Sequence, residues 1–187
     1  MTQIPKNVAR QFTQRLDATK ATAEHAAEAT FEAAGTMLSA VLKGQRIYVC
    51  AAPGRVMLAQ HFAQLMAGTF EHERPGLPVI ALNGVDSQID TVAAAIRAAG
   101  GGGDVLFVIA ENELDEVLPA IHSAHERDMQ VVLLSNGLEE VIEPHLHTSD
   151  RLICTNSDSV GTLIQAQLLL VHTLVSLIDR QLLGLSE

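Results

Sequence analysis

Short apolar runs alternate with longer segments of helical periodicity along this chain. Beyond their first residues, these runs do not alternate with polar positions, as is typical of strands buried on both faces. Strands that alternate with helices favour a parallel sheet covered on both sides. The sequence therefore predicts an α/β fold, a three-layer α/β/α domain with a five-stranded parallel sheet. The expected strands are residues 47–51, 77–82, 104–110, 130–134 and 151–154.

The segments between the strands predict helices, and the two terminal ones are long. The first has Gly35 as its only glycine, so it is one helix or two joined near Gly35, and Gly44 ends it. A helix of this length overhangs the domain, and we expect its outer half to pack on another subunit. The last helix is apolar nearly all round, which also predicts a subunit interface. The expected helices are about 6–43, 55–66, 88–99, 113–127 and 158–183.

A length of 187 residues suits a single domain, residues 1–187. We divide it into an N-terminal helical arm (1–44), an α/β core (45–156) and a C-terminal oligomerisation helix (157–187). Hydrophobic residues make up 48% and charged residues 18%, which excludes a disordered chain. The N-terminus lacks the apolar segment of a signal peptide, and the last helix is too polar for a membrane span. We expect a soluble cytoplasmic protein without a membrane partner.

The charge and the cysteines exclude further classes. The net charge is −10 and basic residues do not cluster, so direct nucleic-acid binding is not expected. Cys50 and Cys154 each lie in an apolar strand, which indicates buried thiols rather than a disulfide or a metal pair. His145 and His147 lie in one loop and offer at most an adventitious metal site.

The first strand and its turn are the best candidate for a binding site. Residues 46–66 read as a strand, a turn at Pro53 and Gly54, and a helix. Such a turn presents free backbone N–H groups at a helix N-terminus, where anions bind in parallel α/β sheets. The run Gly100–Gly103 precedes a strand rather than a helix, so it does not form a phosphate loop. The spacing shows no Ser-His-Asp or Cys-His arrangement.

Two stretches, AQHFA (59–63) and FEHERPGLPVIALN (70–83), resemble the sugar isomerase (SIS) domain proteins of the phosphoheptose isomerase group. The similarity continues in GDVL before the third strand, ERDMQVVLL at the fourth and HTLVSLIDRQLL at the end. Within this group the chain is most similar to the DiaA type, which binds the bacterial replication initiator DnaA. The resemblance implies a homotetramer of α/β/α subunits.

The resemblance also implies a sugar-phosphate pocket, and its loops differ here. The isomerases read GNGGS after the first strand, whereas this chain reads AAPGR (51–55), with Arg55 at the serine position. The second phosphate loop corresponds to residues 110–115, which hold three carboxylates that would repel a phosphate. We expect an Arg55–Glu111 ion pair to fill the pocket. The ligand-binding candidates are Gly54, Arg55, Asn83 and Glu111.

The family's metal site is also incomplete. His61 and His172 match two metal-binding histidines of the isomerases, but Leu65 occupies the position of the glutamate. Gln165 is one residue from the position of the family's glutamine, and one residue turns a helix by about 100°. We therefore expect no metal and no catalytic residue, with His61 and His172 as vestigial candidates. Zinc is expected only if the protein is an isomerase.

These differences predict a non-catalytic scaffold of the DiaA type, which as a homotetramer binds DnaA and promotes initiation of replication. Linked binding sites raise the effective concentration of a partner, so such a scaffold needs no catalysis. Leu182 and Leu183 match a Leu-Phe pair that ends the last helix of the relative, whose Phe is implicated in touching the initiator. They are the partner-binding candidates. The alternatives are a sedoheptulose 7-phosphate isomerase and a degenerate sugar-phosphate-binding sensor.

Overall fold

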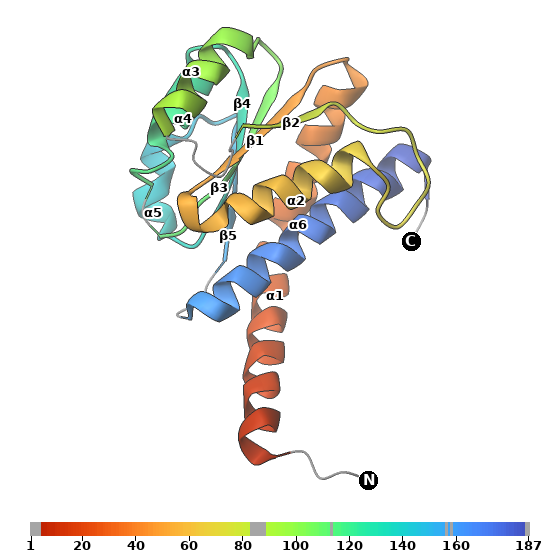
Figure 1. Cartoon of the computed structure of the whole chain (residues 1–187), viewed down its shortest axis with the longest axis vertical. Helices are drawn as coiled ribbons and strands as arrows, with labels where there is room; N and C mark the ends of the chain where they lie inside the picture. Colours follow the sequence, from red (N-terminus) through yellow and green to blue (C-terminus); the bar gives the residue numbers. More distant parts are fainter. Residues whose placement is uncertain (1–4, 83–88, 113, 156, 158, 186–187) are drawn as a thin grey trace.

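A parallel five-stranded sheet lies at the centre of the domain (Figure 1), in a computed structural model that describes residues 5–82, 89–112, 114–155, 157 and 159–185. The strand order is β2-β1-β3-β4-β5, and all neighbouring strands run parallel. The predicted α/β class and the five-stranded parallel sheet are confirmed. The strands are β1 (Ile47–Ala51), β2 (Val79–Ala81), β3 (Val105–Ile109), β4 (Gln130–Ser135) and β5 (Arg151–Cys154).

Helices cover both faces of the sheet, and two clusters of buried side chains fill the space between the layers. One cluster joins alternate residues of the central strands to α1, α2 and α6, and the other joins the opposite residues to α3, α4 and α5. The central strands are therefore buried on both faces, which explains their unbroken apolar sequence. The helices are α1 (Lys6–Leu42), α2 (Val56–Ala67), α3 (Ile89–Ala99), α4 (Leu118–His125), α5 (Glu139–Ile142) and α6 (Val160–Leu183), with 3₁₀ turns η1 (Pro53–Arg55) and η2 (Glu143–His145).

Several boundaries differ from the sequence expectation. The first helix is continuous through Gly35, and Gly44 has a φ of 78°, which fits its predicted role after the helix end. The fourth helix begins at Leu118 rather than at 113, because Pro119 favours the first turn of a helix over its interior. Strand β2 is three residues long, shorter than the predicted 77–82. The short helix α5 was not expected.

The N-terminal half of α1 projects away from the domain, and its C-terminal half packs on α6 and β5 (Figure 1). Fully buried residues of α1 begin only at Thr22, while Phe12 and Leu16 are 66% and 68% exposed. This agrees with the expected overhang. The expectation that the last helix is too polar for a membrane span was wrong, because α6 is long and apolar enough to cross one by length and composition alone. Its buried residues belong to the domain core, so we interpret it as a core helix.

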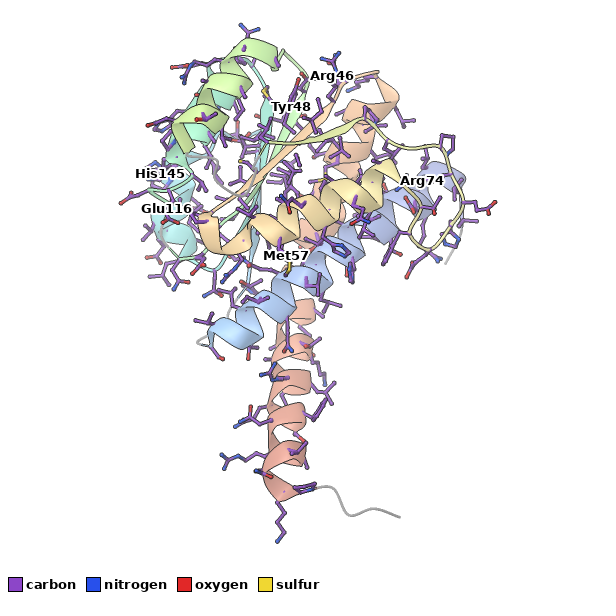
Figure 2. The ribbon with its side chains drawn as sticks, in the orientation of Figure 1. Arg46, Tyr48, Met57, Arg74, Glu116 and His145 are labelled. Carbon is purple, nitrogen blue, oxygen red and sulfur yellow. The ribbon has the colours of Figure 1, made fainter. Side chains whose placement is uncertain are left out.

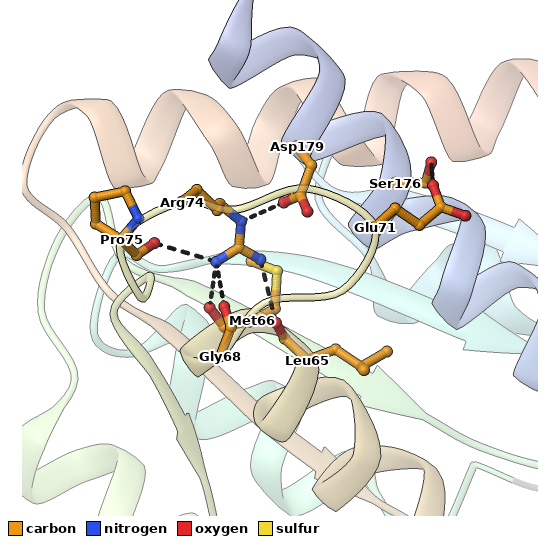
Figure 3. A network of polar contacts seen from close by, with 8 residues as sticks. All are labelled: Leu65, Met66, Gly68, Glu71, Arg74, Pro75, Ser176 and Asp179. Carbon is orange, nitrogen blue, oxygen red and sulfur yellow. Dashed lines mark hydrogen bonds and ion pairs between the residues drawn. The ribbon is translucent and has the colours of Figure 1, made fainter.

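Arg74 fastens the end of α2 to α6 (Figure 3). Its guanidinium is fully buried, pairs with the carboxylate of Asp179, and donates to the carbonyl oxygens of Leu65, Met66 and Gly68. The carbonyls at the end of a helix have no partner within the helix and carry partial negative charge. Arg74 therefore caps α2 with a cation and holds α6 beside it.

Candidate functional site

The turn between β1 and α2 adopts the expected position at the carboxyl edge of the sheet. Pro53–Arg55 forms a single 3₁₀ turn, in which the backbone N–H of Arg55 donates to the carbonyl of Ala52 at 2.8 Å. Gly54 lies directly under the carboxylate of Glu111, because a Cβ at this position would lie 2.6 Å from Glu111 Oε1. A side chain at position 54 would therefore clash with the carboxylate of Glu111, and glycine avoids this clash.

Arg55 is buried inside this turn and bonded on three sides. Its side chain is 3% exposed; Nε donates to Gln167 Oε1 at 2.7 Å, and Nη1 donates to the carbonyl of Gly54 at 3.0 Å. Nη1 also pairs with Glu111 Oε1 at 2.9 Å. The remaining nitrogen, Nη2, is buried and has no hydrogen-bond partner among the described residues. The structure therefore brings together Arg55 and Glu111 as the sequence predicted, and adds Gln167.

The carboxylate of Glu111 lies beside the turn where the sequence predicts a bound anion. Its carboxylate belongs to the same chain, and its side chain remains 42% exposed, so solvent reaches it from one side. The backbone of Glu111 is fixed, because its carbonyl accepts hydrogen bonds from Ser135 Oγ at 2.7 Å and from the N–H of Asn136 at 3.2 Å. The backbone of Glu111 is therefore held independently of its carboxylate.

Helices α2 and α6 lie side by side, and polar contacts join them at two further levels. The first contact is the bond from Arg55, just before α2, to Gln167 on α6. The second is between His61 on α2 and His172 on α6, whose Nε2 atoms are 2.8 Å apart. The ring of Phe70 lies 5.1 Å from that of His172, centroid to centroid. The two nitrogens share one proton at this distance, so one ring donates and the other accepts.

The pKa of His172 is lowered from its ordinary value. Burial is the largest cause, the charge of His61 adds to it, and Glu71 acts in the opposite direction. His172 is therefore neutral at neutral pH. Each histidine faces its own cavity: His61 lines one of about 370 Å³ beside Met57 (labelled in Figure 2), and His172 lines one of about 350 Å³ against the arm of α1.

The zinc ion that the family resemblance implies for an isomerase does not fit the described residues at this position. Leu65 packs against the core where a carboxylate would be needed, and Gln165 is exposed. Within the described parts of the chain, the only group of three or more His, Cys, Asp or Glu side chains close enough to hold a metal lies elsewhere. Two imidazoles without a third ligand do not make a catalytic zinc site.

The remaining predicted residues are spread over the molecule. Asn83 lies outside the described residues. Leu182 is partly buried against the core, whereas Leu183 is 40% exposed, so only Leu183 presents much of its side chain.

The sequence analysis did not identify Gln167, which is 0% exposed. Its Oε1 accepts from Arg55 Nε, and its Nε2 donates to the carbonyl of Ala110. The available signal was a polar residue within an apolar helix, because such a residue needs a partner when it is buried.

Comparisons with known proteins agree with this fold. The SIS domain family matches residues 10–136. The chain belongs to the SIS domain family. It is 32% identical over 194 residues to a phosphoheptose isomerase of Neisseria gonorrhoeae (98% of each chain) and 30% identical over 196 residues to that of Methylibium petroleiphilum (98% of each). A solved phosphoheptose isomerase of Francisella tularensis has a TM-score of 0.84 at 29% identity, over 96% of this chain and 100% of that one.

These relatives place the SIS domain in the phosphoheptose isomerase group, as the resemblance implied. They span the chain from end to end, arm and last helix included. Their names support the isomerase alternative rather than the scaffold that the sequence favoured. Similarity to the DiaA type and the homotetramer stay predictions.

Proposed function

We propose that this SIS domain binds a phosphorylated sugar and interconverts its ketose and aldose forms, as the name of its relatives describes. The observation that carries the proposal is the facing pair His61 and His172 in a chain with whole-length similarity to phosphoheptose isomerases. The expected substrate is sedoheptulose 7-phosphate.

Ketose–aldose interconversion moves a proton between two adjacent carbons and shifts the carbonyl from one to the other. It needs a base that takes the proton from carbon and an acid that supplies one to the carbonyl oxygen. The neutral ring whose lone pair accepts the shared proton can act as such a base once the substrate separates the two rings, and the partner ring that holds the proton is such an acid. His172 is neutral at pH 7 for the reasons given above, so the pair has both forms available without a metal.

Arg55 and Glu111 fit the phosphate of this substrate. The turn already holds an anion against Arg55, namely the half-exposed carboxylate of Glu111. A phosphate would replace it by accepting from Arg55, including from the unpartnered Nη2, while Glu111 turns to solvent. In this arrangement Glu111 competes with the substrate for one cation.

Replacing Glu111 by glutamine is expected to tighten binding of sedoheptulose 7-phosphate about ten-fold, because a competing charge is removed. Titration calorimetry measures the affinity, and a coupled assay measures turnover by the native chain. Glu116→Gln is the matched control, since Glu116 is exposed and carries the same charge in the same loop (Figure 2). No binding at millimolar sugar phosphate by a folded native chain or by Glu111→Gln would refute the proposal. Binding without turnover would favour the sensor.

A second candidate function is the DiaA-type scaffold, which the Arg55–Glu111 ion pair also favours. In this interpretation Arg55 and Glu111 occupy the turn where a phosphate would bind. Leu65 stands where the family resemblance implies a metal-binding glutamate. A homotetramer would use the apolar surface that α1 and α6 expose, which includes Phe12, Leu16 and a cavity of about 280 Å³ beside Phe31. Its partner would be the replication initiator DnaA.

If the scaffold is correct, purified DnaA is retained by the immobilised chain at micromolar concentration. We expect Leu183→Ala to weaken this binding about ten-fold, because an exposed apolar contact is lost. Leu138→Ala is the control, since Leu138 is 73% exposed and lies before α5. Light scattering establishes the oligomer in each variant. Equal retention of DnaA by all three chains would exclude Leu183 as the contact, and no retention by an intact tetramer would exclude the scaffold.

A further inference from the structure

A second group of ligand atoms lies at the opposite edge of the sheet from Arg55 and Glu111. His125 is the last residue of α4, and His147 and Asp150 lie in the segment just before β5. Asp150 also touches the start of β4, where its Oδ1 accepts from the N–H of Val131 at 2.9 Å. The group is therefore at the amino ends of β4 and β5, whereas Arg55 and Glu111 are at the carboxyl ends of β1 and β3.

The carboxylate of Asp150 is held in a fixed orientation. Its side chain is 1% exposed, and Oδ2 accepts from the backbone N–H of His147 at 2.7 Å while Oδ1 is bonded to Val131. Within the described residues, the only basic side chain that pairs with it is His125, whose Nε2 lies 2.8 Å from Oδ2. Two backbone N–H groups and the imidazole of His125 satisfy the hydrogen bonding of this buried carboxylate, and a bound cation would also neutralise its charge.

The two imidazoles lie on the same side of this carboxylate. The rings of His125 and His147 stack with centroids 3.7 Å apart at 16°, and two protonated rings would repel each other in this position. One ligand atom from each of the three residues lies within 4.8 Å of the others. Atoms no more than 4.8 Å apart fit around a centre at most about 2.8 Å from each of them. Shifts of less than about 1 Å, with the two rings turning out of their stack, would bring all three to zinc bond lengths of roughly 2.0–2.2 Å.

We propose that His125, His147 and Asp150 bind a divalent transition-metal ion, and that zinc is the ion that fits best. Two neutral imidazoles and one carboxylate are ligands that zinc accepts, with a fourth position open to water. An adjoining cavity of about 440 Å³, lined by His147 and Asp150 together with Glu139 and Glu143, gives that water access. The ion replaces the proton between His125 and Asp150, and ties the end of α4 to the segment before β5.

Zinc titration of the native chain at pH 7.5 tests this site, with Co²⁺ as a second probe because its visible absorption reports tetrahedral coordination. We expect one ion per chain, and we expect His147→Ala and His125→Gln each to weaken its binding by at least about 100-fold. His147 is exposed, so its removal leaves the fold intact, and zinc should raise the melting temperature of the native chain but not of His147→Ala.

Two variants distinguish this site from other histidines. His145→Ala removes a ring two residues away (Figure 2), and His61→Ala removes half of the pair on α2 and α6. Both variants should keep the affinity of the native chain. Zinc binding that persists in His147→Ala, that disappears in His61→Ala, or that is absent at about 100 μM zinc would overturn the proposal.

Discussion

Replacing Arg74 by methionine is expected to lower the free energy of unfolding by about 3–5 kcal/mol. The substitution leaves the carboxylate of Asp179, which is 0% exposed, without its cation, and removes the donors to three carbonyls at the end of α2. Breaking a buried pair by removing one partner leaves an uncompensated charge, which is the main cost. Urea denaturation followed by circular dichroism, at one fixed chain concentration, measures the change.

The double variant Arg74→Met with Asp179→Leu separates the charge from the carbonyl bonds. It should recover part of the loss, because no buried charge remains, while the carbonyls stay without a donor. Glu71→Gln is the control in the same loop, because the exposed carboxylate of Glu71 accepts a hydrogen bond from Ser176 Oγ. We expect it to change the free energy of unfolding by no more than about 0.5 kcal/mol. A loss below about 1 kcal/mol in Arg74→Met would show that the pair does not hold α2 against α6.

The sheet could be predicted from the sequence because its signal is local. Each central strand is buried on both faces, so its residues read as one unbroken apolar run, as in Val105–Ile109. Helix starts were less certain, since the periodic pattern before α4 continues into residues that Pro119 keeps out of the helix. Strand β2 lies at the sheet edge, and its residues are partly exposed. The apolar run there predicted a longer strand than the structure has.

The candidate site divides in the same way. Arg55 and Glu111 were predicted as a pair because the family resemblance assigns both to phosphate loops of one pocket. The structure explains their contact, since the two loops follow the neighbouring parallel strands β1 and β3. Gln167 and Asp179 were not, because their partners lie more than 100 residues away and only the packing of α6 on α2 brings them together. Asp150 was not singled out from the sequence, and only its burial beside His125 distinguishes it.

His172→Gln is expected to reduce turnover of sedoheptulose 7-phosphate by about 100- to 10,000-fold, the usual contribution of a general acid or base. Glutamine keeps a hydrogen-bonding group beside His61 but takes up no proton from carbon. The pH profile of the native chain gives a second readout. The base must be neutral, and the pKa of His172 lies below its ordinary value of 6.5, so activity should persist below pH 6.5 and fall only in more acidic buffer.

A measurement independent of turnover comes from the coupling between the two rings. Because the charge of His61 lowers the pKa of His172, His61→Gln should raise the pKa of His172 toward 6.5, as followed by NMR titration of its ring. The direction follows from charge repulsion: with no second imidazolium nearby, protonation of His172 becomes easier. His122→Gln, an exposed histidine on α4, should leave that pKa unchanged. A His172 pKa that does not respond to His61→Gln would mean that the rings do not face each other in solution, and the acid–base pair on which the isomerase proposal rests would be lost.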